Sequence, residues 1–166
     1  IKKLNKMSEE EGIGVRVYGG NEVYADVEGI NAIIEGKVLT LNDSRYVLLE
    51  TDSGLTETSV FNIINTVLSA GKIPVLAHVE RSPRLAQNIE LLKLLNKEGA
   101  LLLLNGMGIT MCETRFQRRI ISKILEAGVI FAVASDCHDM VFRKPLLTEA
   151  ALAVFKILGK EEAKRL

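Results

Sequence analysis

The stretch GKIPVLAHVERSP, Gly71 to Pro83, contains the pattern that decides the fold. Gly71 follows a helical pattern and precedes an apolar run, which is the usual place of a helix C-cap glycine. The run from Ile73 to His78 is continuous rather than alternating. A continuous run is typical of a parallel strand that is covered on both faces. We therefore predict a buried strand whose carboxyl end opens onto polar residues.

The same arrangement recurs along the chain of 166 residues. Gly99 and Gly128 also stand between a helical pattern and an apolar run. The predicted strands are Val15 to Tyr18, Tyr46 to Glu50, Ile73 to His78, Ala100 to Asn105 and Val129 to Ser135. The predicted helices are Ile1 to Glu11, Glu57 to Ser69, Arg84 to Lys97, Glu113 to Glu126 and Leu147 to Leu158. This alternation predicts βαβ units in one α/β domain that spans residues 1–166.

Composition excludes several classes of partner. Lys plus Arg and Asp plus Glu number 21 each, so no net charge draws the chain to nucleic acid or to anionic lipid. No apolar stretch reaches the roughly 18 residues that a membrane span needs. The two cysteines, Cys112 and Cys137, are too few for a disulfide framework and suit a reducing compartment. We expect a cytoplasmic protein that neither binds nucleic acid nor inserts into a membrane.

Polar residues with metal-binding chemistry stand at the strand ends. A spacing of 28 residues separates Glu22 from Glu50 and Glu50 from His78, which predicts equivalent depths on neighbouring strands. Asp136 and His138, two residues apart, would point to the same side of an extended segment. Carboxylates and imidazoles together suit Mn, Zn or Fe. Singly, each has an ordinary alternative: a solvated carboxylate, a core histidine or a helix cap. Their joint occurrence at one predicted rim favours a metal site.

Two arginines follow closely on these segments. Arg81 and Arg143 could be solvated surface residues, or planar forks that bind phosphate oxygens in a bidentate manner. Three other arginines lie on a helical pattern away from the strand ends, and we interpret them as a solvated face: Arg115, Arg118 and Arg119.

Four blocks of sequence resemble a known family in the same order: GGNEV, LNDSRYVLLE, GKIPVLAHVERSP and FAVASDCHDM. They are similar to the signature blocks of the manganese-dependent tyrosine-protein phosphatases of capsule and exopolysaccharide operons, the CpsB/CapC type. This family belongs to the polymerase-and-histidinol-phosphatase (PHP) superfamily. The resemblance implies a distorted (β/α)7 barrel with a multinuclear metal cluster at the carboxyl ends of its strands.

The resemblance also implies a role for each candidate residue. Ligands of Mn²⁺, or of Zn²⁺, Fe or Mg²⁺, would be Glu22, Glu50, His78, Asp136 and His138. Arg81 and Arg143 would bind the substrate phosphate. The implied reaction is hydrolysis by a metal-activated water, without a covalent phosphoenzyme. The implied substrate is a phosphotyrosine protein, namely the autophosphorylated tyrosine kinase of a polysaccharide export system.

The sequence departs from the family pattern at its start. Members begin with an Asp-x-His-x-His strand and carry a further metal-binding histidine, and neither is present here. Five predicted strands against seven imply about the last five β/α units of the barrel, so a domain that is incomplete at its N-terminus. We therefore expect weak Mn²⁺ or Zn²⁺ binding, turnover near background from these 166 residues alone, and exposed sheet edges that favour self-association. The main alternative is an inactive, interaction-only fragment.

A second alternative is thiol chemistry. Cys137 and Arg143 have the C-x5-R spacing of the thiol-dependent tyrosine phosphatases. The phosphate loop of those enzymes usually needs glycine to aim its amides, whereas the interior here is His-Asp-Met-Val-Phe. We therefore rank this mechanism below the metal site and expect Cys137 to be a small buried residue between two ligands.

Overall fold

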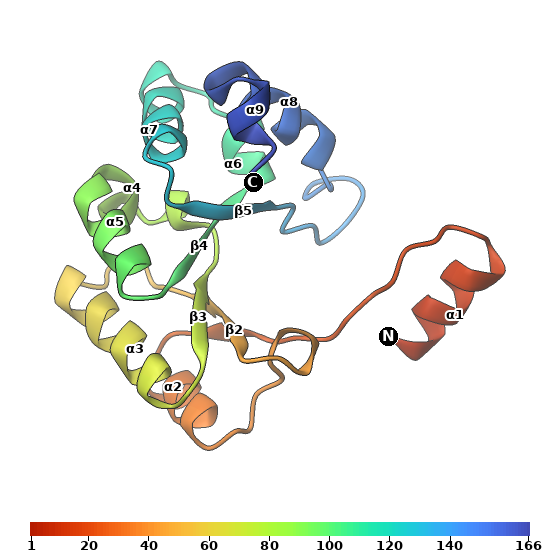
Figure 1. The fold of residues 1–166 in the computed structure, drawn as a ribbon, viewed down its shortest axis with the longest axis horizontal. Helices are drawn as coiled ribbons and strands as arrows, with labels where there is room; N and C mark the ends of the chain where they lie inside the picture. The colour runs from red at the N-terminus through yellow and green to blue at the C-terminus, as the bar shows by residue number, and fades with distance from the viewer.

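A computed structural model describes residues 1–166 and contains a five-stranded, fully parallel sheet. The strands lie side by side in sequence order (Figure 1). They are β1 (Glu22–Tyr24), β2 (Tyr46–Glu50), β3 (Ile73–Leu76), β4 (Leu101–Asn105) and β5 (Ile130–Ala134). Four of these coincide with predicted strands, and the α/β architecture with βαβ connections is confirmed.

Helices connect the strands. They are α1 (Lys2–Glu10), α2 (Val27–Ile34), η1 (Leu41–Asp43), α3 (Glu57–Ser69), η2 (Val79–Arg81), α4 (Pro83–Gln87), α5 (Ile89–Lys97), α6 (Gly106–Thr110), α7 (Arg115–Glu126), α8 (Leu147–Leu158) and α9 (Lys160–Ala163). The helix predicted over 84–97 is broken at Asn88, whose side chain accepts a hydrogen bond from the Leu91 amide and begins α5. The helix α2 lies outside the predicted helices, although Asp26 caps it as an N-cap aspartate should. None of the helices is both long and apolar enough to cross a bilayer.

The two faces of the sheet are unequal. Alternate residues such as Val47, Leu49, Leu76, Leu102 and Leu104 are fully buried against the helices. The intervening residues of β1 and β2 are exposed or half-buried, as are Leu101 and Leu103 of β4, whereas Val75 of β3 is buried. The expectation of strands covered on both faces is therefore confirmed for β3 and wrong for β1, β2 and most of β4. The continuous apolar runs suggested burial on both faces because the second face also carries leucines and alanines, which are only half-buried. One face therefore forms the core, and the other is open for chemistry.

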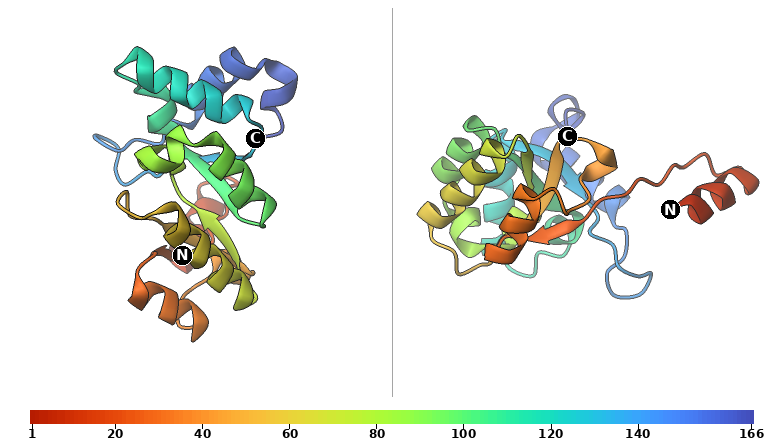
Figure 2. Two further views of the ribbon diagram at one scale, coloured as in Figure 1. Left: turned by 90° about the vertical axis from the view of Figure 1, so that its left-hand side faces the viewer. Right: turned by 90° about the horizontal axis from the view of Figure 1, so that it is seen from below.

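The strand predicted over Val15 to Tyr18 is wrong. This segment is extended but unpaired, because side chains of α1 take up its backbone groups. Asn5 donates to the Val17 carbonyl and accepts from the Val17 amide, and Ser8 makes the same pair of bonds with Val15. Helix α1 and this segment project together from the rest of the molecule (Figure 2). The first strand instead begins at Glu22.

We predict that Gly29→Ala destabilises the fold by about 1–3 kcal/mol. A methyl group at Gly29 would lie 2.0 Å from the carbonyl oxygen of Tyr24, which is backbone and has little room to move. Alanine is otherwise favourable in a helix, so any loss of stability reports this clash between α2 and β1. Chemical denaturation measures it. Asn31→Ala, at an exposed position of the same helix, is the control, and equal stabilities of the two variants would contradict the packing argument.

Candidate metal and phosphate site

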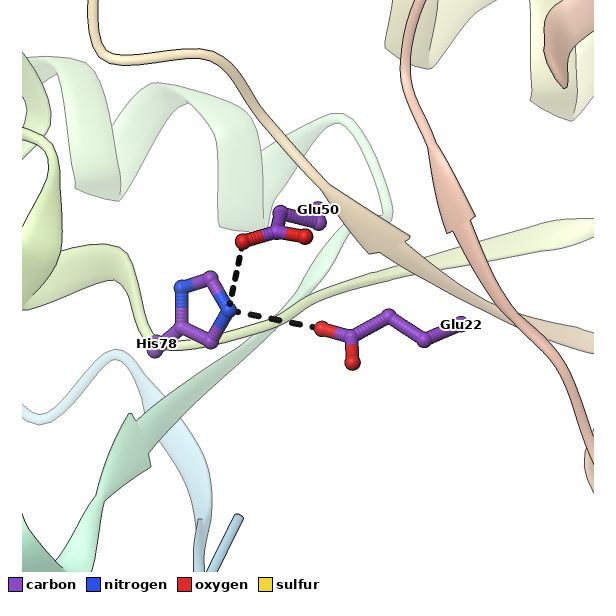
Figure 3. A group of neighbouring side chains, drawn as sticks. All are labelled: Glu22, Glu50 and His78. Atoms are coloured by element: carbon purple, nitrogen blue, oxygen red, sulfur yellow. Dashed lines mark ion pairs between the residues drawn. The ribbon is translucent and has the colours of Figure 1, made fainter. Parts of the chain in front are cut away.

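Three of the predicted ligands converge at the carboxyl end of the sheet (Figure 3). Nε2 of His78 lies 3.3 Å from Oε1 of Glu22 and 3.4 Å from Oε1 of Glu50. The three ligand atoms all lie within 4.8 Å of one another. His78 is buried, whereas the two glutamates are partly exposed. Two carboxylates and an imidazole this close form an oxygen and nitrogen donor set that fits a divalent cation.

The strand register shows how these side chains meet. Glu22 pairs with Leu48, and Tyr24 pairs with Glu50, so the two glutamates share a face but differ in depth by two residues. The prediction of equivalent depths is therefore wrong, because the strands are staggered. His78 has left-handed backbone angles, φ 34° and ψ 55°, which turn its side chain out of the strand pattern. The long side chains of the glutamates and this turn together bring the two carboxylates to the imidazole of His78.

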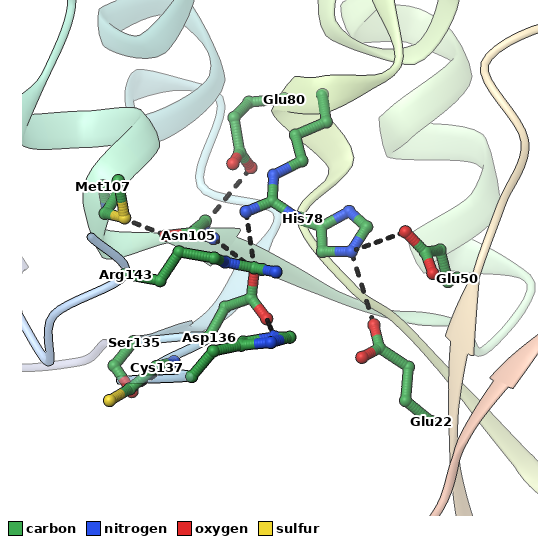
Figure 4. Close-up of polar contacts among 12 residues, drawn as sticks. Glu22, Glu50, His78, Glu80, Asn105, Met107, Ser135, Asp136, Cys137 and Arg143 are labelled. Atoms are coloured by element: carbon green, nitrogen blue, oxygen red, sulfur yellow. Dashed lines mark hydrogen bonds and ion pairs between the residues drawn. The ribbon is translucent and has the colours of Figure 1, made fainter. Parts of the chain in front are cut away.

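A second cluster surrounds Asp136, just beyond β5 (Figure 4). Oδ2 of Asp136 accepts hydrogen bonds from Arg81 at 2.5 Å, from the Asn105 amide group at 2.8 Å and from Arg143. Oδ1 lies 3.3 Å from Nε2 of His138. Burial acts to raise the pKa of Asp136, but the charge and hydrogen bonds of the two arginines outweigh it, and the pKa is lowered. Asp136 is therefore an ionised carboxylate that holds two guanidinium groups.

The two clusters face one hollow of about 80 Å³, to which Glu22, His78, Asn105 and Asp136 all contribute. All five predicted ligands thus lie at the same end of the sheet. Only three form the compact group, because Asp136 and His138 lie with the arginines instead. Asn105 ends a predicted strand, but it is not among the predicted site residues. Its amide group is one of the donors to Asp136.

Glu80 is the most perturbed acid in the structure. Its Oε2 accepts from the Asn105 backbone amide at 3.3 Å, whereas its buried Oε1 has no hydrogen-bond partner. A Cβ at Gly108 would lie 2.6 Å from that Oε1, so a side chain there would force the carboxyl group of Glu80 to shift. Burial raises the pKa of Glu80 to about 7, against the lowering effect of backbone N–H groups and of Arg81. The sequence signalled only that Glu80 follows a strand.

The loop after Asp136 does not form a phosphate cradle. Oδ1 of Asp139 accepts from the amides of Val141 and Phe142, at 2.6 Å each, and from that of Arg143. The His138 amide donates to the Arg143 carbonyl, so the loop amides are used internally. Cys137 is exposed, which corrects the expectation that it is buried. This geometry disfavours the thiol mechanism.

Comparison with known proteins gives a consistent result. The family model described as "Capsular polysaccharide synthesis, CpsB/CapC" matches residues 1–166. The tyrosine-protein phosphatase CpsB of Streptococcus pneumoniae is 27% identical over 152 residues, which are 89% of this chain and 63% of that protein. The tyrosine-protein phosphatase YwqE of Bacillus subtilis is 29% identical over 161 residues, which are 96% of this chain and 63% of that protein.

The fold also matches solved structures. The chain superposes with a TM-score of 0.84 and 27% identity on a structure from the study of YwqE from B. subtilis and CpsB from S. pneumoniae, which are metal-dependent tyrosine phosphatases. The match covers 98% of this chain and 66% of that structure. The chain thus spans slightly less than two thirds of the length of these relatives.

We predict that Glu80→Gln changes the pH dependence of stability, measured by urea denaturation with a chelator present. The pKa of Glu80 is 4.5 in the unfolded chain and about 7 in the folded chain. The folded wild type therefore loses stability as the pH rises from about 4.5 to 7, because the unfolded chain gives up this proton first. Glutamine removes that loss. The free energy of unfolding of the variant minus that of the wild type should be on the order of 2 kcal/mol larger at pH 8 than at pH 4.5.

The exposed Glu98 provides the control for this measurement. Glu98→Gln should show no such difference between the two pH values. A Glu80→Gln effect that is the same at both would mean that Glu80 ionises normally in the folded chain.

Proposed function

The chain belongs to the CpsB/CapC family of capsular polysaccharide synthesis proteins, and we propose that it takes part in the metal-dependent removal of phosphate from tyrosine side chains of a protein. The relatives named above, which are tyrosine-protein phosphatases, support this activity. One observation on this chain carries it. The trio of Glu22, Glu50 and His78, which fits a cation, lies beside two arginines that fit phosphate oxygens. Arg81 lines one hollow with Glu50 and His78, and both Arg81 and Arg143 donate to Asp136, which lines the neighbouring hollow with Glu22 and His78.

We propose that Glu22, Glu50 and His78 hold one divalent cation, and that Asp136 and His138 contribute to a further position of a multinuclear cluster. The metal-dependent relatives and the oxygen and nitrogen donors support this assignment. Among the metals that suit such donors, we propose Mn²⁺. When bound, the metal would act as a Lewis acid on the phosphate and lower the pKa of the attacking water.

The arginines have a separate role in the proposal. Arg81 and Arg143 would donate to the equatorial oxygens of the phosphoryl group, whose charge they match as planar forks. Asp136 holds both guanidinium groups beside the hollow, so they are oriented before a substrate arrives. Cys137 takes no part, and no covalent intermediate forms on the protein.

The wider setting is also part of the proposal. The parallel sheet, with β1 and β5 at its edges, supports its interpretation as part of a PHP-type barrel within a single domain. The open edges favour self-association. We propose a phosphorylated tyrosine kinase of polysaccharide export as the substrate, and the family description supports the link to capsular polysaccharide synthesis. The two free cysteines suit the reducing cytoplasm.

We predict that calorimetry detects weak Mn²⁺ binding by the chain, and that His78→Ala weakens it by at least about tenfold, because a ligand and its fixed geometry are lost together. Asp136→Ala should weaken binding less if the trio forms the tighter position. Glu98→Gln, which removes one exposed carboxylate, is the charge-matched control for Asp136→Ala and should leave the affinity unchanged. Unchanged affinity in His78→Ala would remove the trio from the metal site.

We predict that phosphatase activity of the full-length protein on phosphotyrosine peptides is lost with a chelator and restored by Mn²⁺. Arg143→Met should lower kcat by about 10²-fold, as expected for loss of one donor to the transition state. Cys137→Ser should retain the wild-type rate. Activity that survives chelation but not Cys137→Ser would establish the thiol mechanism instead. Mn²⁺ binding without turnover would establish the alternative of an inactive, interaction-only protein.

A further inference from the structure

A groove of about 650 Å³ begins at Arg81 and runs between α4, α6 and α7. Apolar and polar side chains both line it, and the apolar part of the wall comes from residues such as Ala86, Met107, Met111, Phe116 and Ile120. Phe116 is 62% exposed and Met111 56% exposed, although both are large apolar side chains. Large exposed apolar side chains that line a concavity mark a binding surface, because a partner that covers them removes them from water.

The groove is continuous with the proposed phosphate site through one residue. Arg81 lines the groove, and its guanidinium donates to Asp136. Arg81 also borders a second hollow, of about 230 Å³, on the side of Glu50 and His78. That hollow is lined almost entirely by polar side chains. A phosphate at Arg81 would therefore have the metal ligands on one side and the apolar groove on the other.

Size and charge indicate what the groove holds. Its volume lies within the range of pockets that enclose a drug-sized molecule, so a single tyrosine ring leaves much of it unfilled. Arg81 lines the groove beside its apolar residues, and this pairing suits a peptide that carries both a phosphate and an apolar side chain.

Resting on the proposed function, we propose that this groove is the specificity subsite for an apolar residue that flanks the phosphotyrosine in the substrate protein. Phe116 and Met111 form its apolar contact, and Met107 adds a flexible thioether that adapts to side chains of different shape. Arg81 links the two subsites, because it lines the groove while its guanidinium donates to Asp136 at the proposed phosphate site. The protein would thus select a sequence around the phosphotyrosine rather than any aryl phosphate.

The test measures binding rather than turnover. Peptides that carry a non-hydrolysable difluoromethylphosphonate analogue of phosphotyrosine are titrated into the Mn²⁺-loaded full-length protein by calorimetry. Each peptide carries one leucine in place of alanine, and the set covers the three positions on either side of the analogue. At one or more of these positions, leucine should lower Kd by about five- to tenfold, the gain expected from burying one aliphatic side chain.

Phe116→Ala and Met111→Ala should each remove most of that gain, and phenylphosphonate, which has no flanking residues, should bind both variants as it binds the wild type. Both side chains are exposed, so the fold should tolerate the changes, which thermal denaturation checks. Phe131→Ala is the matched control, since Phe131 is 54% exposed and does not line the groove. It should keep the leucine preference.

The outcomes separate the two proposals. If phenylphosphonate binds in a manner that depends on Arg143, but no leucine position improves affinity, the phosphate site stands and the groove assignment is wrong. The same conclusion follows if Phe116→Ala and Met111→Ala keep the full leucine preference. If phenylphosphonate does not bind at all, the proposed function itself fails, and the subsite falls with it.

Discussion

The carboxylate of Asp136 is the contact on which the arrangement of the site depends. Through one oxygen it joins residues that follow three different strands, namely Arg81 after β3, Asn105 at the end of β4 and Arg143 in the loop after β5. Arginines on flexible stems would otherwise lose considerable side-chain freedom on meeting a phosphate. The charge-assisted bonds to Asp136 restrict that freedom in advance, which is how preorganised donors contribute to catalysis.

Backbone strain occurs at the same strand ends. His78 and Asp136 both have positive φ, at 34° and 49°, although neither is glycine. Such conformations cost on the order of 1–3 kcal/mol each and persist only where the surrounding structure enforces them. Strands β3 and β5 hydrogen-bond to β4, whose Leu102 and Leu104 are fully buried. The core therefore stabilises two turns that aim a histidine and an aspartate at one hollow.

The two faces of the sheet have different tasks. The covered face supplies most of the core through residues such as Val47, Leu49 and Leu76. At the carboxyl end of the sheet lie the trio of Glu22, Glu50 and His78 and the two arginines that donate to Asp136. Beyond Arg81, the groove runs between the helices α4, α6 and α7. Glu80 lies where these regions meet, since it lines the groove and bonds to the Asn105 backbone. Its buried oxygen without a hydrogen-bond partner lowers the stability of the folded chain.

The sequence by itself determined the parallel α/β sheet and the polar residues at its carboxyl ends. Glycine-bounded apolar runs and helical periodicity are local signals, and they located β2 to β5 together with Glu50, His78, Asp136 and His138 at their ends. Local signals could not exclude a strand at Val15 to Tyr18, because the hydrogen bonds from Asn5 and Ser8 that replace strand pairing come from a helix earlier in the chain. The stagger between Glu22 and Glu50, the left-handed turn at His78, the pairing of Asp136 with both arginines and the burial of Glu80 were decided only by the tertiary structure. Each depends on atoms that are distant in the sequence or on backbone angles that residue identity does not fix.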